Sequence, residues 1–147
     1  MGLPAVGRLL AVDWGEIRFG LALSDETQTI ATPLSTLTRR AGKRFPMPAF
    51  LALVTEHRPV GLVVGLPLTP EGNEGPAAFK ARELAGQLGG RTYLPVELVD
   101  ERVTTARAHA AIREQGGSTR GRRGDVDALA AAVLLQHFLE IRRHASG

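Results

Sequence analysis

Three acidic residues stand next to predicted elements of secondary structure. Asp13 ends one apolar run, Glu101 comes just past another, and Asp127 stands near the start of a long apolar helix. Carboxylate oxygens are preferred ligands of Mg²⁺ and Mn²⁺, and two such ions about 3.5–4 Å apart can activate a water for phosphodiester hydrolysis. If the fold brings these carboxylates to one edge of a sheet, the pattern predicts a metal-dependent hydrolytic site.

The same residues have a purely structural interpretation. Acidic residues are common at strand ends and helix N-termini, where Asp127 would favour the helix dipole and Glu101 would lie in a solvated loop. Asp125 stands two residues before Asp127 and would point about 200° away from it on a helix. It is a fourth candidate carboxylate only if the helix starts later.

Composition narrows the class of protein. The chain has 147 residues and no cysteine, which excludes disulfide scaffolds, cysteine-ligated zinc and thiol catalysis. Its 18 basic residues exceed its 15 acidic ones by a formal charge of +3, which is weak evidence for nucleic acid. The longest apolar stretch, 128–135, is too short to span a bilayer, and no signal peptide is evident. We expect a single domain over 1–147, cytoplasmic, with no membrane partner.

Hydrophobic patterning predicts the elements that must position the carboxylates. Strands are expected over residues 8–12, 19–23, 30–38, 60–66 and 93–99, the third at a sheet edge because it contains proline. Helices are expected over residues 48–58, 76–88, 104–115 and 125–143, with Gly89 and Gly90 ending the second and a glycine- and arginine-rich loop over 116–124.

This order predicts an α/β fold with a five-stranded mixed sheet flanked by helices. The first three strands would form an antiparallel meander, and the later strands would be parallel. Sites in such sheets are expected at the carboxyl ends of the parallel strands. Both Asp13 and Glu101 follow strands in a way that suits this edge.

Glycines shape the segment that follows Asp13. Gly15 permits a tight turn, and Gly20 allows a backbone or a substrate phosphate to approach closely. Turns of this kind also occur in the first phosphate loop of actin-like ATPases and sugar kinases. Those proteins need a second lobe to close on the nucleotide, and 147 residues do not provide one.

Basic residues gather in two short clusters, each beside a predicted loop. A solvated face would explain one cluster alone, but two clusters beside a metal site favour a track for phosphates. Aromatic residues are scarce, so Trp14 is the one candidate near the site for stacking on bases. The clusters consist of Arg39, Arg40, Lys43 and Arg44, and of Arg120, Arg122 and Arg123.

Four segments resemble the signature motifs of the YqgF family, in order and with similar spacing. The family has an RNase H-like fold, and its members are assigned as pre-16S ribosomal RNA nucleases or Holliday junction resolvases. The likeness covers nearly the whole chain. The segments are DWGEIRFGLALSD (13–25), VVGLPLTPEGNEGP (63–76), DERVTT (100–105) and DALAA (127–131).

The resemblance implies roles for individual residues. Asp13, Glu101 and Asp127 fall on the family's acidic positions and would bind Mg²⁺ or Mn²⁺. Arg18 and Arg102 match motif arginines, which would contact phosphate or pin the neighbouring carboxylates; a structural ion pair explains each equally well.

The resemblance and the carboxylates together predict a metal-dependent nuclease acting on structured RNA, in 5′-end processing of pre-16S rRNA. A first alternative is a resolvase cutting branched DNA, which would need two active sites and hence a dimer. A second is an RNase H-like nucleic-acid-binding module without catalysis. The expected partner is RNA, with branched or linear DNA as the alternative, and the expected state is a monomer or weak homodimer.

Overall fold

The apolar segments of the chain form one five-stranded sheet. The computed structural model describes residues 2–101 and 123–146. The strand order is β3-β2-β1-β4-β5, with β2 antiparallel to its neighbours β1 and β3 and with β1, β4 and β5 parallel, which confirms the predicted mixed sheet and its meander. The strands are β1 (Leu9–Asp13), β2 (Arg18–Ser24), β3 (Ala31–Thr38), β4 (Gly61–Leu66) and β5 (Val96–Asp100).

The central strands are buried because both of their faces are apolar. In β1, alternate residues point to opposite faces, with Leu10 and Val12 in one hydrophobic cluster and Leu9 and Ala11 in another. Strand β4 is buried at every position, as a strand covered on both faces must be. The end of β1 is therefore held rigidly between two layers.

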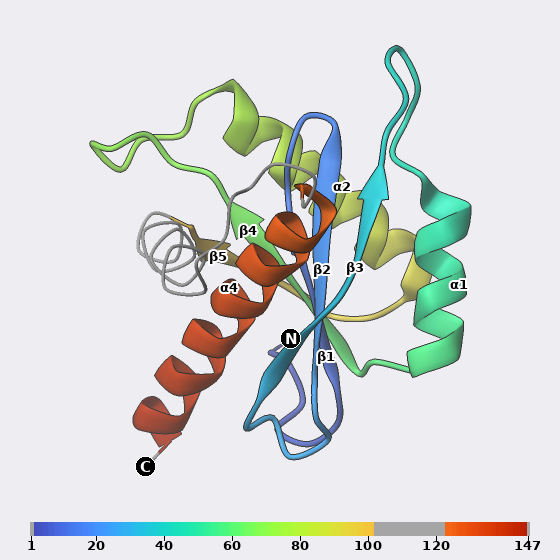
Figure 1. The fold of residues 1–147 in the computed structure, drawn as a ribbon. Helices are drawn as coiled ribbons and strands as arrows, with labels where there is room; N and C mark the ends of the chain where they lie inside the picture. Colours follow the sequence, from blue (N-terminus) through green and yellow to red (C-terminus); the bar gives the residue numbers. More distant parts are fainter. Residues whose placement is uncertain (1, 102–122, 147) are drawn as a thin grey trace.

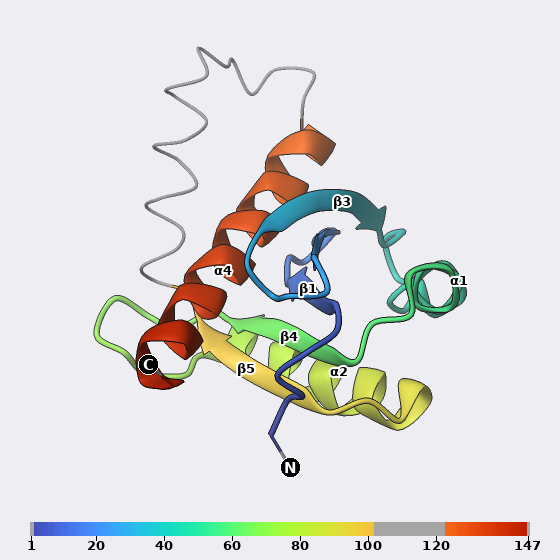
Figure 2. The same cartoon turned by 90° about the horizontal axis from the view of Figure 1, so that it is seen from below.

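Helices cover the two faces of the sheet unequally. Helix α4 (Arg123–Ser146) crosses one face against β1, β2 and β3, whereas α1 (Met47–His57) and α2 (Pro76–Thr92) lie on the other (Figures 1 and 2). Within the described part of the chain, no helix is both long and apolar enough to cross a membrane. The predicted helix over 104–115 lies outside the described residues, as does most of the loop over 116–124.

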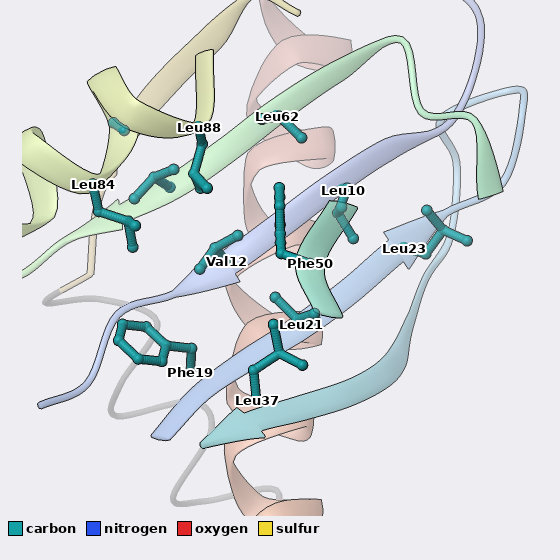
Figure 3. Close-up of a cluster of buried hydrophobic side chains, with 12 residues drawn as sticks. Leu10, Val12, Phe19, Leu21, Leu23, Leu37, Phe50, Leu62, Leu84 and Leu88 are labelled. Carbon is teal, nitrogen blue, oxygen red and sulfur yellow. The ribbon is translucent and has the colours of Figure 1, made fainter. Parts of the chain in front are cut away.

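Phe50 anchors α1 to the sheet. Its ring is fully buried and lies over the strands among leucines of β1, β2 and β4 (Figure 3). Phe45 packs edge-on against both Phe19 and Phe50, with ring centroids 4.8 and 5.7 Å apart. The connector before α1 is thereby fixed to the sheet.

Helix α2 ends later than predicted, and β5 begins later as a consequence. The helix continues through Gly89 and Gly90 to Thr92, and Tyr93 ends it with a left-handed φ of 61° and an N–H donated to the Gly89 carbonyl. Glycine permits helix termination but does not force it. The strand predicted to start at 93 therefore starts at Val96.

Two further boundaries bear on the site. Strand β1 ends at Asp13, which confirms the position predicted for this carboxylate at the end of the first strand. Helix α4 begins at Arg123, two residues before the predicted start, so Asp127 lies one turn inside the helix and not in its first turn. Because the helix dipole acts mainly on the first turn, it explains the presence of Asp127 less well than the sequence suggested.

Glycines inside α2 offer a test of its packing. At Gly86 an added Cβ would meet nothing within 4 Å, whereas at Gly89 it would lie 3.2 Å from Val96 Cγ2. Because alanine is the better helix former by about 1 kcal/mol, we expect Gly86→Ala to raise the Tm by roughly 2–4 °C. Gly89→Ala should gain less or lose stability, because Val96 must move. Thermal unfolding followed by circular dichroism measures both, and a larger gain at Gly89 than at Gly86 would contradict this packing.

Candidate active site

The carboxyl ends of β1, β4 and β5 meet at one edge of the sheet and bring Asp13 and Glu101 together. Asp13 is the last residue of β1, and Glu101 directly follows β5. The backbone N–H of Glu101 donates to the Leu66 carbonyl at the end of β4, at 3.2 Å. The position of Glu101 is therefore set by the sheet itself.

Two glycines beside Asp13 make room for the other two carboxylate residues. Gly20 pairs with Asp13 across β1 and β2, and a Cβ there would collide with the carbonyl oxygen of Asp127. Gly65 directly follows Val64, the β4 partner of Val12, and a Cβ there would collide with the Glu101 carboxyl group. The predicted close approach at Gly20 is thus made by the backbone of α4.

Asp13 and Glu101 share a proton. Their side chains are hydrogen-bonded to each other. Burial, the hydrogen bond to Asp13 and the charges of Asp13 and Asp100 raise the pKa of Glu101 to about 10. The pKa of Asp13 is also raised, by burial and by the charge of Asp127, although its bond to Glu101 opposes the shift. At neutral pH Glu101 is therefore protonated and donates a hydrogen bond to Asp13.

Arg18 pairs with Asp127. Its Nε donates to Asp127 Oδ2 at 2.7 Å, and the two side chains are 37% and 26% exposed. This contact fits two of the interpretations left open by the sequence, an arginine that pins a neighbouring carboxylate and a structural ion pair. Arg18 also joins the start of β2 to α4, which are 109 residues apart in the chain.

The chemistry of these donors fits a hard divalent cation. Asp13 is close enough to both Glu101 and Asp127 for their interactions to move its pKa, and a cation would relieve that crowding of negative charge. Within residues 2–101 and 123–146, however, no three side chains of His, Cys, Asp or Glu are arranged to hold an ion together. The side chain of Asp125 lies outside the described residues.

The four residues of the first basic cluster have different surroundings. Arg39 is a brace, because its Nε donates to the Glu16 carbonyl at 2.8 Å and its Nη1 to the Lys43 carbonyl at 3.0 Å. Lys43 and Arg44 line a groove with Arg39, whereas Arg40 is exposed outside it. Arg102, Arg120, Arg122 and the side chain of Arg123 lie outside the described residues.

The groove is lined by Trp14, which follows Asp13 in the sequence, by the connector before α1 and by one face of α2. It has a volume of about 880 Å³. Lys80 and Arg91 of α2 also line it, and neither was identified from the sequence. They are 11 residues apart, which is about three helical turns, so both lie on the same face of α2. The helical repeat could have indicated this from the sequence.

The two glycines should respond differently to the same substitution. Gly20→Ala meets backbone and forces α4 to move, so we expect a loss of about 1–3 kcal/mol, or roughly 3–10 °C in Tm. Gly65→Ala meets the Glu101 side chain and no backbone, so we expect its Tm to fall by less than that of Gly20→Ala. Calorimetry of both variants measures this contrast, and equal losses would show that Gly20 does not set the position of α4.

The protonated Glu101 predicts a pH-dependent stability. Its pKa is about 10 in the folded protein against an ordinary value of 4.5, so its contribution is complete below about pH 4.5 and is lost as the pH rises toward 10. Gln cannot ionise, so Glu101→Gln in EDTA should raise the Tm at about pH 8 by roughly 2–6 °C and by less at about pH 5. Glu97→Gln, an exposed position of β5, is the control. A gain independent of pH would contradict the shared proton.

Comparisons with known proteins bear on the fold and the family. The chain overlays on Thermus thermophilus RuvC in complex with a Holliday junction substrate with a TM-score of 0.56 and 17% identity, covering 94% of this chain and 96% of that one. The yeast mitochondrial Holliday junction resolvase Ydc2 gives a TM-score of 0.52 and 8% identity, covering 94% and 80%. These likenesses confirm the RNase H-like fold.

Two relatives are similar over nearly their whole length. A protein of Anaeromyxobacter sp. (strain Fw109-5) is 45% identical over 94% of this chain and 99% of its own. One of Nocardioides sp. (strain ATCC BAA-499 / JS614) is 43% identical over 93% and 90%. Both are named "Putative pre-16S rRNA nuclease". The family model described as "RuvX: Holliday junction resolvase" matches residues 7–141. The chain belongs to this RuvX family, the one its motifs indicated under the name YqgF.

Proposed function

We propose that this chain is a divalent-metal-dependent nuclease that hydrolyses phosphodiester bonds in structured RNA, at the 5′ end of pre-16S rRNA. The buried pair of Asp13 and Glu101 at the ends of β1 and β5, with Asp127 near enough to raise the pKa of Asp13, carries the proposal. The name shared by relatives up to 45% identical supports the RNA substrate. The proposal places the activity in the cytoplasm, in a single domain that is a monomer or a weak homodimer.

The family description favours a second substrate. The family is described as Holliday junction resolvases, so branched DNA cut by the same carboxylates is the alternative. A binding module without catalysis is less well supported, because such a module has no need for ionisable groups crowded in a buried position. Buried acidic groups with raised pKa values are typical of catalytic sites.

Asp13, Glu101 and Asp127 are the residues that would hold Mg²⁺ or Mn²⁺. When bound, the metal supplies an activated water and stabilises the leaving oxygen. Asp13 and Glu101 contribute by ionising together, which requires the shared proton to leave Glu101. Arg18 keeps Asp127 Oδ2 in place by its 2.7 Å hydrogen bond.

Removal of one carboxylate tests the proposal. Asp13→Asn should lower cleavage of a pre-16S rRNA fragment at least about 100-fold in Mg²⁺ or Mn²⁺, and EDTA should abolish cleavage by the unmodified protein. Glu97→Gln removes an exposed carboxylate of β5, near Glu101 in sequence, and should cut normally. Cleavage is measured on gels with end-labelled RNA, linear DNA and a four-way DNA junction in parallel.

Each outcome of this panel has a definite meaning. If Asp13→Asn cuts RNA as fast as the unmodified protein, the assigned site is wrong. If only the four-way junction is cut, in paired incisions, the resolvase alternative is correct.

A further inference from the structure

The groove beside Asp13 has features that the catalytic carboxylates do not require. Its volume of about 880 Å³ is at the upper end of the roughly 300–1,000 Å³ of small-ligand sites, and its lining includes Trp14, the residue after Asp13. A ligand in the groove therefore contacts the residue that follows a candidate catalytic carboxylate in the sequence.

The charges of the groove favour an anion. Five basic residues line it against two acidic ones, Glu16 and Glu83. Arg39 is held by backbone carbonyls, which leaves four cationic side chains along the rim. Among residues 2–101 and 123–146, none of these four forms an ion pair. They are Lys43, Arg44, Lys80 and Arg91.

Aromatic side chains contribute to the lining between these cations. Trp14 and Phe45 are both half-buried and both line the groove. Trp14 is held by packing against the cluster of Leu66, Ala78 and Ala81, and Phe45 by its edge-on contacts with Phe19 and Phe50. Fixed aromatic groups beside a cationic rim are typical of surfaces on which the bases of single strands stack.

We propose that this groove binds a single strand of nucleic acid that leads to the scissile phosphate, with its phosphates on Lys80, Arg91, Lys43 and Arg44 and a base on Trp14. The inference rests on the proposed nuclease function and adds the form of the substrate at this position. A duplex would be gripped mainly through its backbone and would leave its stacked bases out of reach of Trp14.

The distance between the cations of α2 fits a short single-stranded segment. Lys80 and Arg91 are 11 residues apart on α2, or about 16 Å along its axis at 1.5 Å per residue. Stacked nucleotides rise about 3.4 Å each, so a few nucleotides extend from one cation to the other. The substrate is then a structured RNA with an unpaired segment next to the cut.

Trp14 is the single tryptophan of the chain, so its fluorescence reports on the groove alone. In EDTA, where no cleavage occurs, a 12-nucleotide oligouridylate should quench Trp14 in a saturable manner. In Lys80→Gln/Arg91→Gln the Kd should rise at least about fivefold, and the slope of log K against log salt should fall by roughly one for each residue removed. Arg58→Gln, at the far end of α1 and outside the groove, removes one charge and should leave both values unchanged.

A second pair of variants compares an added side chain inside the groove with the same side chain outside it. An added Cβ meets nothing within 4 Å at Gly90, which lines the groove, or at Gly86, which does not. Gly90→Glu should weaken binding of the oligouridylate at least about fivefold, whereas Gly86→Glu adds the same charge to the same helix and should have less than a twofold effect.

Three results would overturn the inference. Fluorescence anisotropy could show the oligouridylate bound while Trp14 is not quenched, or the two Gln substitutions could leave its Kd unchanged. A blunt 12-base-pair RNA duplex could quench Trp14 as strongly as the single strand at equal occupancy. Because binding is measured without cleavage, failure here leaves the Asp13→Asn test intact, and failure of that test leaves the binding result standing.

Discussion

The candidate site depends on glycine, a residue without a side chain, at two positions beside Asp13. Gly20 on β2 and Gly65 on β4 flank the end of β1, and a Cβ at either would occupy space that Asp127 or Glu101 now fills. Glycine at these positions weakens the strands slightly, because it contributes no packing and loses more conformational freedom on folding. In exchange for this small loss of strand stability, the two glycines leave room for Asp127 of α4 and for Glu101, which follows β5, near Asp13 at the end of β1.

Crowding of acidic groups opposes folding, so other contacts must offset it. The pKa values of Asp13 and Glu101 are raised because burial and neighbouring charges disfavour ionisation, whereas Asp127 is paired with Arg18. The fully buried apolar layers on both faces of β1 hold the strand end in place despite this repulsion. A local instability of this kind is typical of sites where function, and not stability, selects the residues.

The sheet and two of its acidic positions could be predicted because they depend on local patterns. Continuous apolar runs indicated the central strands, and Asp13 and Glu101 follow from where those runs end. The end of α2 could not be predicted, because Tyr93 and not the two glycines terminates the helix. The bonds of Arg39 to the carbonyls of Glu16 and Lys43 could not be predicted either, because only the fold brings the β1–β2 turn beside the connector before α1. Lys80 and Arg91 were missed because they lie far apart in sequence and join one surface only through the helical repeat.

The turn between β1 and β2 couples the groove to the carboxylates. Gly15 lies so close to the Arg18 carbonyl that a Cβ would collide with it, which keeps the turn tight. One end of the turn presents Trp14 to the groove, and the other presents Arg18 to Asp127. Arg39 ties the Glu16 carbonyl between them to the connector before α1. A nucleic-acid strand bound to Trp14 would therefore contact the same turn that leads to Arg18, the residue that orients Asp127. Binding in the groove and the geometry of the carboxylates thus depend on one short turn.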